Sequence, residues 1–160
     1  MQNVPASVAN ELLELDNQIC FALHSTARQL VRAYRPALEG LELTHPQYLV
    51  MLVLWGWAKD REQRPTVKAL GDRLLLDSGT LTPLLKRLQS RGLITRTRSS
   101  TDEREVFVHL TRAGQSLKKR AVRVPMTLLE QSRMPLGELV ELREGLKRLR
   151  SVLKPAEARP

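Results

Sequence analysis

The chain has 160 residues, of which 42% are hydrophobic and 27% are charged, and a formal net charge of +9 at pH 7. Such a chain can bury the core of one domain with helical extensions, and its basic excess favours a polyanionic partner, nucleic acid before an anionic membrane surface. No apolar run approaches the ~18 residues of a membrane span, no secretory signal is evident, and one cysteine excludes an intrachain disulfide, so we expect a cytoplasmic protein without membrane contact.

The first predicted element is a long amphipathic helix that ends near Tyr34. Its apolar side chains recur at steps of three, four or seven residues, which is the spacing of one helix face. These side chains are Leu12, Leu15, Ile19, Leu23, Leu30 and Tyr34. Pro36 and Gly40 then predict that the chain leaves the helix. Cys20 lies on this helix.

A second predicted helix begins at a capping box. Thr44 and Gln47 have the required spacing, and Pro46 is tolerated in a first helical turn. From Tyr48 to Trp55 nearly every face is apolar, so we expect this helix to lie at the centre of the core.

Two shorter helices then form a helix-turn-helix. Thr66 is placed to cap a helix over 67–74, and Asp77 or Ser78 is placed to cap a second helix that ends before Gly92. Helices of about eight and thirteen residues joined by a short turn are typical of this unit.

A β-hairpin follows the helix-turn-helix. Residues 94–98 and 105–110 have the pattern of strands, and the polar segment 99–103 between them predicts a hairpin tip. The order helix, helix, strand, loop, strand is that of a winged helix.

The last predicted helices lie outside the winged helix. Thr111 is placed to cap one of them, Pro125 should kink or break it, and the final helix runs from about 135 to 153. Their apolar stripes, like that of the first helix, need a partner, and a second copy of the chain is the simplest one.

We therefore predict a mainly α fold with a small β-hairpin wing. Residues 1–43 and 111–160 would form a dimerisation region, and residues 44–110 the winged helix-turn-helix DNA-binding domain. The positive charge is placed accordingly, since residues 64–104 hold nine basic and four acidic side chains.

The candidate DNA contacts lie on the second helix of the pair and in the wing. Small polar side chains can enter a major groove, basic ones can hold phosphates, and wing arginines can reach the minor groove or backbone. The predicted contacts are Ser78, Thr80, Thr82, Lys86, Arg87, Arg96, Arg98, Asp102 and Arg104, with Arg91 as a further phosphate clamp. Asp102 is placed to fix the turn for Arg104. The alternative is that these are ordinary solvent-facing side chains.

Two interpretations of Cys20 stay open from the residues alone. A lone cysteine on an apolar helix face is usually a small buried hydrophobe. A reactive cysteine needs groups that favour its thiolate, and His24 lies one turn away. Three scattered histidines and one cysteine show no metal-ligand spacing, so we predict no metal and no cofactor.

Several segments resemble one family. The stretches 15–23 (LDNQICFAL), 43–50 (LTHPQYLV), 76–87 (LDSGTLTPLLKR) and 102–106 (DEREV) resemble the organic hydroperoxide resistance regulators, a branch of the MarR superfamily. The resemblance runs from about Leu13 to Val124. Its Asp-x-Arg wing pattern is general to the superfamily, whereas the cysteine segment and the segment 76–87 are more specific.

The resemblance implies a dimeric repressor that is active when reduced and binds double-stranded DNA at an inverted repeat. An organic hydroperoxide would oxidise the position that matches Cys20 to a sulfenic acid, and the DNA would be released. With one cysteine in the chain, only a small external thiol, the backbone nitrogen or overoxidation remains as the next step.

The resemblance also implies a sensor pocket of tyrosines, of which Tyr34 matches one. Fourteen residues of helix place it about 21 Å from Cys20, so the pocket would be completed by the partner's helix. At His24 and His45 the family more often has tyrosine, which leaves the usual network in question. Either histidine can instead be an ordinary core or surface residue.

Other functions stay as alternatives. The closest is a repressor of the same fold that is released by a small phenolic or lipophilic ligand, with Cys20 structural. A thiol peroxidase is another alternative, but nothing in the sequence resembles a peroxidase active site with its resolving cysteine, so we predict that the chain is not an enzyme. Steady turnover of hydroperoxide with a thiol reductant would support the peroxidase instead. An architectural DNA-compacting protein would bind with little sequence preference and strong salt dependence.

Overall fold

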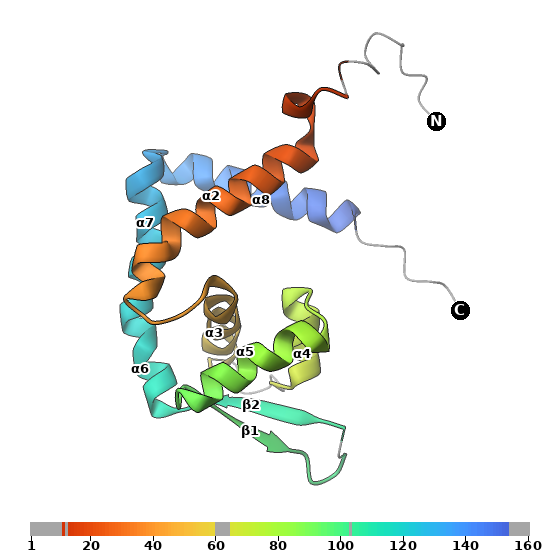
Figure 1. The fold of residues 1–160 in the computed structure, drawn as a ribbon, viewed down its shortest axis with the longest axis vertical. Helices are drawn as coiled ribbons and strands as arrows, with labels where there is room; N and C mark the ends of the chain where they lie inside the picture. Colours follow the sequence, from red (N-terminus) through yellow and green to blue (C-terminus); the bar gives the residue numbers. More distant parts are fainter. Residues whose placement is uncertain (1–10, 12, 60–64, 103, 154–160) are drawn as a thin grey trace, which may run out of the picture.

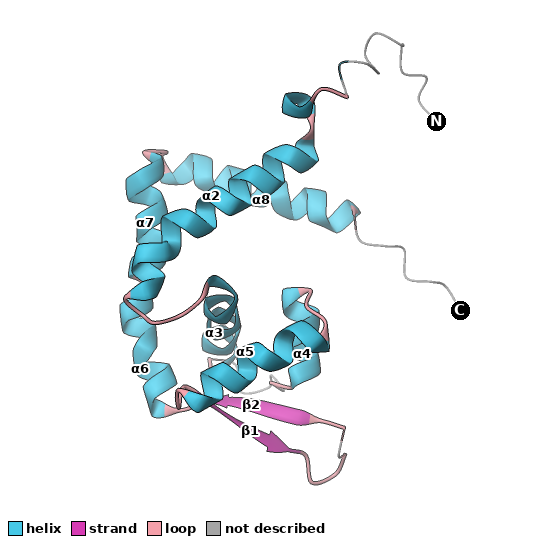
Figure 2. Cartoon of the chain, in the orientation of Figure 1, coloured by secondary structure: helices cyan, strands magenta, loops and turns pink. Residues whose placement is uncertain are grey.

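The computed structural model describes residues 11, 13–59, 65–102 and 104–153. In chain order the elements are η1 (Leu15–Asn17), α2 (Ile19–Glu39), α3 (His45–Trp57), α4 (Val67–Leu74), α5 (Ser78–Ser90), β1 (Ile94–Arg98), β2 (Val106–Leu110), α6 (Arg112–Ala121), α7 (Arg123–Ser132) and α8 (Leu136–Val152). The elements are helical apart from the two strands, which confirms the predicted fold class (Figure 2).

The molecule has two parts, shown in Figure 1. We call α3, α4, α5 and the hairpin the head, and α2, α7 and α8 the arms. In Figure 1, α6 leads from the hairpin up to α7, which packs beside α2. The head therefore lies at one end, and Cys20 on α2 at the other.

The core of the head is built around α3. Val50 and Met51 of α3 are fully buried, and so are Leu85 and Leu88 of α5 and Val108 of β2. Burial of one such side chain stabilises the fold by about 1.5–3 kcal/mol. The prediction that the helix with apolar residues on nearly every face lies at the centre is confirmed.

Helix starts in the head follow the predicted caps. The Thr44 hydroxyl accepts from the Gln47 backbone N–H, and the Gln47 side chain accepts from the Thr44 N–H at 2.9 Å, which completes the capping box. The Thr66 hydroxyl accepts from the Ala69 N–H at the start of α4. The Thr111 hydroxyl likewise accepts from the Gly114 N–H at the start of α6, which follows the head. Each such cap contributes about 1 kcal/mol.

The wing is an antiparallel hairpin that is joined to the helices of the head. Its register pairs Ile94 with Leu110 and Arg98 with Val106. A bridge between Thr66 and Phe107 joins β2 to the start of α4. The strands match the predicted ranges except that β2 begins one residue later.

The predicted first helix was wrong at both ends. Leu12 lies outside the described residues, and the chain forms the short helix η1 before it turns extended at Gln18 and enters α2 at Ile19. The Asn17 side chain donates to the Glu11 carbonyl at 2.8 Å. Such local side-chain bonds compete with helical ones. Cys20 is consequently the second residue of α2 rather than a mid-helix residue.

At its other end the first helix passes through Pro36 and stops at Glu39. A proline inside a helix removes one backbone hydrogen bond and is normally unfavourable. Here Leu38 is buried against the core. The packing of this last turn outweighs the proline signal from the sequence.

Pro125 has the predicted effect. The helix that Thr111 caps, α6, ends at Ala121, and α7 starts at Arg123 after Val122. Pro125 is the third residue of α7, where its missing N–H has no helical partner to lose. Leu136–Val152 matches the predicted last helix.

Candidate DNA interface and sensor cysteine

The second helix of the helix-turn-helix, α5, has one buried and one exposed face. Leu81, Leu85 and Leu88 are buried in the head. On the remaining surface Ser78, Thr80, Lys86 and Arg87 are exposed and Thr82 is half-buried. The structure thus gathers the predicted polar side chains of this helix on one surface.

Asp77 fixes the start of α5. One carboxylate oxygen accepts from the Thr80 backbone N–H and the other from the Thr80 hydroxyl, both at 2.8 Å. The backbone hydrogen bond from Thr80, followed by the bond from its hydroxyl, lowers the pKa of Asp77. The Thr80 hydroxyl therefore belongs to the cap as well as to the exposed surface.

The turn between α4 and α5 sets the angle of the pair. The Leu76 N–H donates to the Gly71 carbonyl at 3.0 Å, and a Cβ on Gly71 would lie 2.8 Å from the Leu76 carbonyl oxygen. Leu75 takes the left-handed conformation at φ 56°. Only glycine at position 71 allows the turn to approach α4 this closely.

The wing arginines have different surroundings. Arg96 donates from Nε to Gln89 Oε1 at 2.6 Å, so it ties β1 to α5. Arg98 and Arg104 are exposed. Asp102 Oδ1 accepts from the Arg104 backbone N–H at 2.9 Å, which confirms the predicted local bond at this turn.

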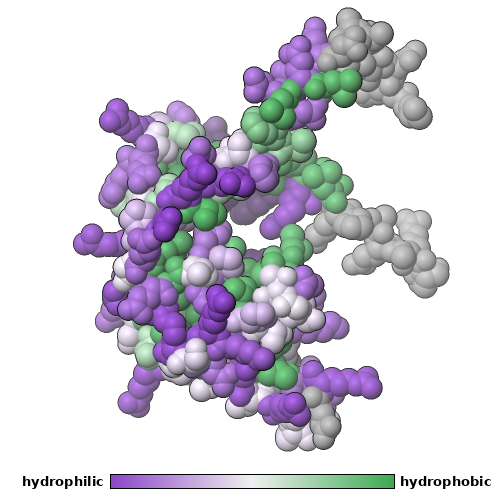
Figure 3. Space-filling view, viewed as in Figure 1, coloured by the Kyte–Doolittle hydropathy of each residue, from purple (hydrophilic) through white to green (hydrophobic). Residues whose placement is uncertain are grey.

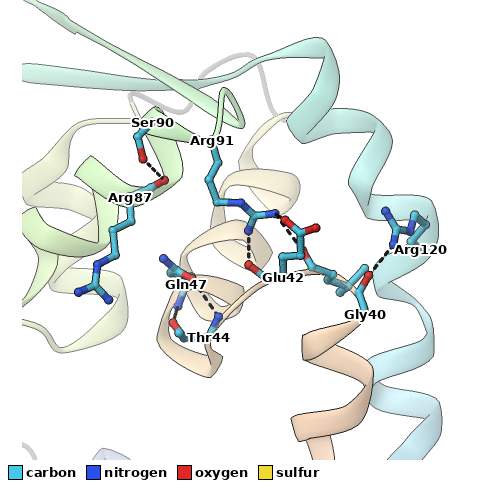
Figure 4. A network of polar contacts seen from close by, with 9 residues as sticks. Gly40, Glu42, Thr44, Gln47, Arg87, Ser90, Arg91 and Arg120 are labelled. Carbon is cyan, nitrogen blue, oxygen red and sulfur yellow. Dashed lines mark hydrogen bonds and ion pairs between the residues drawn. The ribbon is translucent and has the colours of Figure 1, made fainter.

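Arg91, predicted as a phosphate clamp, bonds to another part of the chain instead. Its guanidinium bonds the turn that follows α2, at Leu41 and Glu42 (Figure 4). Sequence patterns also missed Gln89 as the partner of Arg96. Neither contact has a sequence signal, because both join residues through the folded chain.

Cys20 is exposed at the N-terminal end of α2. Its thiol donates weakly to Gln18 Oε1, with Sγ and oxygen 3.7 Å apart. The first backbone N–H groups of a helix lack helical partners and carry partial positive charge, which favours an anion beside them. Exposure makes the sulfur accessible, in contrast to the interpretation of Cys20 as a buried hydrophobe.

Tyr34 and His45 lie together at the other end of α2. Their ring centroids are 6.3 Å apart. Burial raises the pKa of Tyr34 and lowers the pKa of His45. Tyr48 is a third member, which the sequence analysis placed only in the core; burial first and then Tyr34 raise its pKa. At ordinary pH this cluster therefore holds neutral rings and phenolic O–H donors.

His24 is separate from this cluster. It is exposed one turn along α2 from Cys20, and it lines an open groove with Phe21 and Arg28. Within one chain the structure thus pairs Tyr34 with His45 and leaves Cys20 with His24 about 21 Å away at the other end of the helix.

Within residues 11, 13–59, 65–102 and 104–153, no three His, Cys, Asp or Glu side chains are grouped closely enough to hold a metal ion. No helix among the same residues has the length and apolar character to cross a membrane.

The head defines the class of the protein, a winged helix-turn-helix regulator of transcription, and the comparisons with known proteins agree. Residues 32–121 match the family model for the transcriptional regulator SarA/Rot. An organic hydroperoxide resistance transcriptional regulator of Bacillus subtilis is 44% identical over 88% of this chain and 92% of its own. The transcriptional regulator TtmR of Methylorubrum extorquens is 46% identical over 87% of this chain and 69% of its own.

A solved structure gives the same result. The structure of reduced AbfR bound to DNA superposes on this chain with a TM-score of 0.72 at 31% identity, over 93% of this chain and 100% of that one. AbfR is a protein of Staphylococcus epidermidis. The chain belongs to the MarR superfamily of transcriptional regulators. It is a regulator rather than an enzyme, because its relatives are regulators.

Proposed function

We propose that this chain is a DNA-binding repressor that releases its operator when an organic hydroperoxide oxidises Cys20. The observation that carries the proposal is the exposed thiol at the N-terminal end of α2, the helix whose other end joins the DNA-binding head. The likeness to the Bacillus subtilis regulator supports the choice of oxidant. Such a repressor acts where the DNA is, in the cytoplasm.

The DNA-binding surface we propose consists of the exposed side of α5 and the wing. Ser78, Thr80 and Thr82 would read base edges, Lys86 and Arg87 would hold phosphates, and Arg98 and Arg104 would reach the minor groove or backbone. Arg96 would contribute to this surface while its bond to Gln89 holds β1 against α5. Asp102 would hold the turn that carries Arg104.

The arms supply the argument for a dimer, in which residues 1–43 and 111–160 would form the dimerisation region around a head of residues 44–110. No residue of α8 is buried, and most of its apolar side chains are exposed. Figure 3 shows apolar surface along the N-terminal part of α2 and near the end of α8. The large apolar side chains that are exposed in and beside the arms are Leu13, Leu15, Ile19, Leu23 and Val31 before and on α2, Val122 and Met126 at α7, and Leu136, Val140, Leu142, Leu146, Val152 and Leu153 on and after α8.

A second copy would cover these side chains and set the two α5 helices about 34 Å apart, the spacing of successive major grooves on an inverted repeat. Closed two-fold symmetry is the commonest arrangement for such self-complementary surfaces. The partner's α2, running antiparallel, would bring its own Tyr34 and His45 toward Cys20.

The chemistry at Cys20 begins with the thiolate. Its sulfur attacks one oxygen of the hydroperoxide; an S–O bond forms, the O–O bond breaks, and the alkoxide leaves as an alcohol after it takes a proton. The sulfur is oxidised to a sulfenic acid and the peroxide is reduced. A small thiol then condenses with the sulfenic acid to give a mixed disulfide and water, because the chain holds no second cysteine.

Tyr34 suits the role of hydrogen-bond donor to the thiolate. Because burial raises its pKa, its hydroxyl keeps its proton at neutral pH. His24 would take the place one turn from the sulfur, and His45 would hold the Tyr34 ring. The oxidised sulfur is larger and needs other partners, so α2 would shift against its neighbour and the heads would lose their spacing.

Fluorescence anisotropy tests this function. We would titrate the protein onto labelled duplex from the region upstream of its own gene, with and without cumene hydroperoxide and a small thiol. Wild type should release the DNA on oxidation, and Cys20→Ser should keep it bound. If both variants respond alike, Cys20 is structural, and a phenolic or lipophilic ligand becomes the better candidate for the inducer.

A further inference from the structure

The turn that follows α2 is held by two arginines from different helices. The last carbonyl groups of a helix have no helical partner and carry partial negative charge. In this turn the consecutive carbonyl oxygens of Gly40, Leu41 and Glu42 each accept a hydrogen bond from a guanidinium group. Figure 4 shows both arginines around the turn.

Arg91 contributes most of these bonds. It follows the last residue of α5, and its Nη1 donates to the Glu42 carbonyl. Its Nη2 donates to the Leu41 carbonyl at 3.2 Å and to the Glu42 carboxylate at 2.9 Å. The Arg91 side chain is 29% exposed, and charge-assisted bonds of this kind are about twice as strong as neutral ones.

Arg120 holds the opposite side of the turn. It comes from α6, and its Nη2 donates to the Gly40 carbonyl. The end of α2 is therefore bonded to the end of α5, the helix we propose to enter the DNA groove, and to α6 on the other side.

The conformation of the turn is fixed as well. Glu42 is in the left-handed region at φ 54°, which is unfavourable for a non-glycine residue. Leu41 and Leu43 on either side of it are buried in the core. The turn is therefore held in one arrangement in which the Glu42 carboxylate meets Arg91.

We infer that Arg91 is a positioning residue that transmits movement of α2 to the recognition helix α5. The inference rests on the proposed function, since it concerns how oxidation at Cys20 reaches the DNA-binding surface. Helix α2 is continuous from Ile19 to Glu39, with the thiol at one end and this turn at the other. A tilt of α2 displaces the turn, and the three bonds of Arg91 carry that displacement to the end of α5.

Arg91→Gln tests the coupling, and Arg87→Gln, in the last turn of α5 just before Arg91, is a matched control. The Arg87 side chain extends away from the turn (Figure 4). For each protein we would measure operator affinity in the reduced and oxidised states at several salt concentrations, the rate of thiol loss at Cys20 with cumene hydroperoxide and a small thiol, and the melting temperature.

For wild type we expect oxidation to lower affinity at least about tenfold, within the usual range of coupling between sites. Arg91→Gln should keep its reduced-state affinity within about threefold and its rate of Cys20 oxidation unchanged, while the affinity ratio between the two states falls to about twofold. Arg87→Gln should weaken both states equally and reduce the salt slope by about one, as for a lost phosphate contact.

A second variant guards against a simple loss of folding. Glu42→Gln removes the carboxylate but leaves both carbonyl bonds, so its affinity ratio should lie between those of wild type and Arg91→Gln. The affinity ratio of the double variant, Arg91→Gln with Glu42→Gln, should equal that of Arg91→Gln alone, because both changes act through one contact.

Two results would overturn the inference. One is an Arg91→Gln protein with the wild-type affinity ratio; the other is an Arg91→Gln protein that behaves like Arg87→Gln, which would make Arg91 a phosphate contact. If wild type itself does not respond to the hydroperoxide, the proposed function fails first. If wild type responds and Arg91→Gln has the same affinity ratio as wild type, the inference about Arg91 is wrong and the proposed function stands.

Discussion

The head and the arms differ in how they bury their apolar side chains. Met51, Leu85 and Val108 of the head are fully buried within one chain, and the described side-chain N and O atoms that are buried all have hydrogen-bond partners. In α8, by contrast, no residue is buried. The head thus buries its apolar side chains within one chain, whereas α8 leaves most of its own exposed. Substitutions in the two parts should therefore have different effects.

The largest expected effect comes from Gly114 of α6, the helix that packs against α3 and β2 of the head. A Cβ on Gly114 would lie 2.1 Å from the Leu93 carbonyl oxygen, and the Gly114 carbonyl accepts from Trp55 Nε1 at 2.8 Å. Gly114→Ala must displace backbone, so we expect a loss of about 4 kcal/mol or more in the free energy of unfolding. Urea unfolding at fixed protein concentration measures it.

Gly137 in α8 gives the control for this prediction. A Cβ there would meet nothing within 4 Å, so Gly137→Ala should change the free energy of unfolding by under about 1 kcal/mol. Equal losses for the two variants would contradict the contrast between head and arm.

Leu85→Ala should have the next largest effect. The side chain is fully buried between the helices of the head, and its truncation leaves a cavity that costs about 2–5 kcal/mol. Thermal unfolding should show a lower melting temperature, with the oligomeric state unchanged in analytical ultracentrifugation. A cost below that of an exposed leucine such as Leu52→Ala would show that Leu85 is not part of the tightly packed core of the head.

Leu142→Asp tests the arms. Leu142 is 50% exposed in a single chain, and burial of an uncompensated polar group costs about 1–3 kcal/mol. If a second copy covers α8, the dimer dissociation constant should rise at least about tenfold, which sedimentation velocity over a concentration series measures. The secondary structure should stay intact by circular dichroism. An unaltered sedimentation profile would mean that α8 does not belong to a dimer contact.

The same contrast explains what the sequence could predict. The predicted helix caps at Thr44, Thr66 and Thr111 are confirmed, because a cap is a local contact over three residues that the sequence pattern alone indicates. Apolar periodicity located the core of the head for the same reason. The hairpin and its tip followed from strand pattern and polar composition.

The errors lie where distant residues decide the outcome. The burial of Leu38 carries α2 past Pro36, which no local rule predicts. Periodicity ran across Gln18 because the apolar spacing continues there, although the backbone turns extended. Arg91 has the composition of a phosphate contact, and only the fold reveals its bonds to a turn 49 residues earlier.

The smallest expected effect is a pH dependence that arises where arm and head meet. His45 lies at the start of α3, with Tyr34 of α2 beside it and Tyr48 one turn along its own helix. Burial lowers the pKa of His45 below its ordinary value of 6.5. The unfolded chain therefore binds this proton more readily than the folded one. Stability is full above pH 6.5 and declines as the pH falls from 6.5 through the lower folded pKa.

Urea unfolding at pH 7.5, 6.5 and 5.5, at fixed protein concentration, measures this dependence. As the pH falls, the urea midpoint should decrease more for wild type than for His45→Gln, and His24→Gln is the control for loss of an exposed histidine. Parallel pH profiles for wild type and His45→Gln would show that the cluster of Tyr34, His45 and Tyr48 does not disfavour a charged imidazole, and the contact between the arm and the head would then be less enclosed than its geometry indicates.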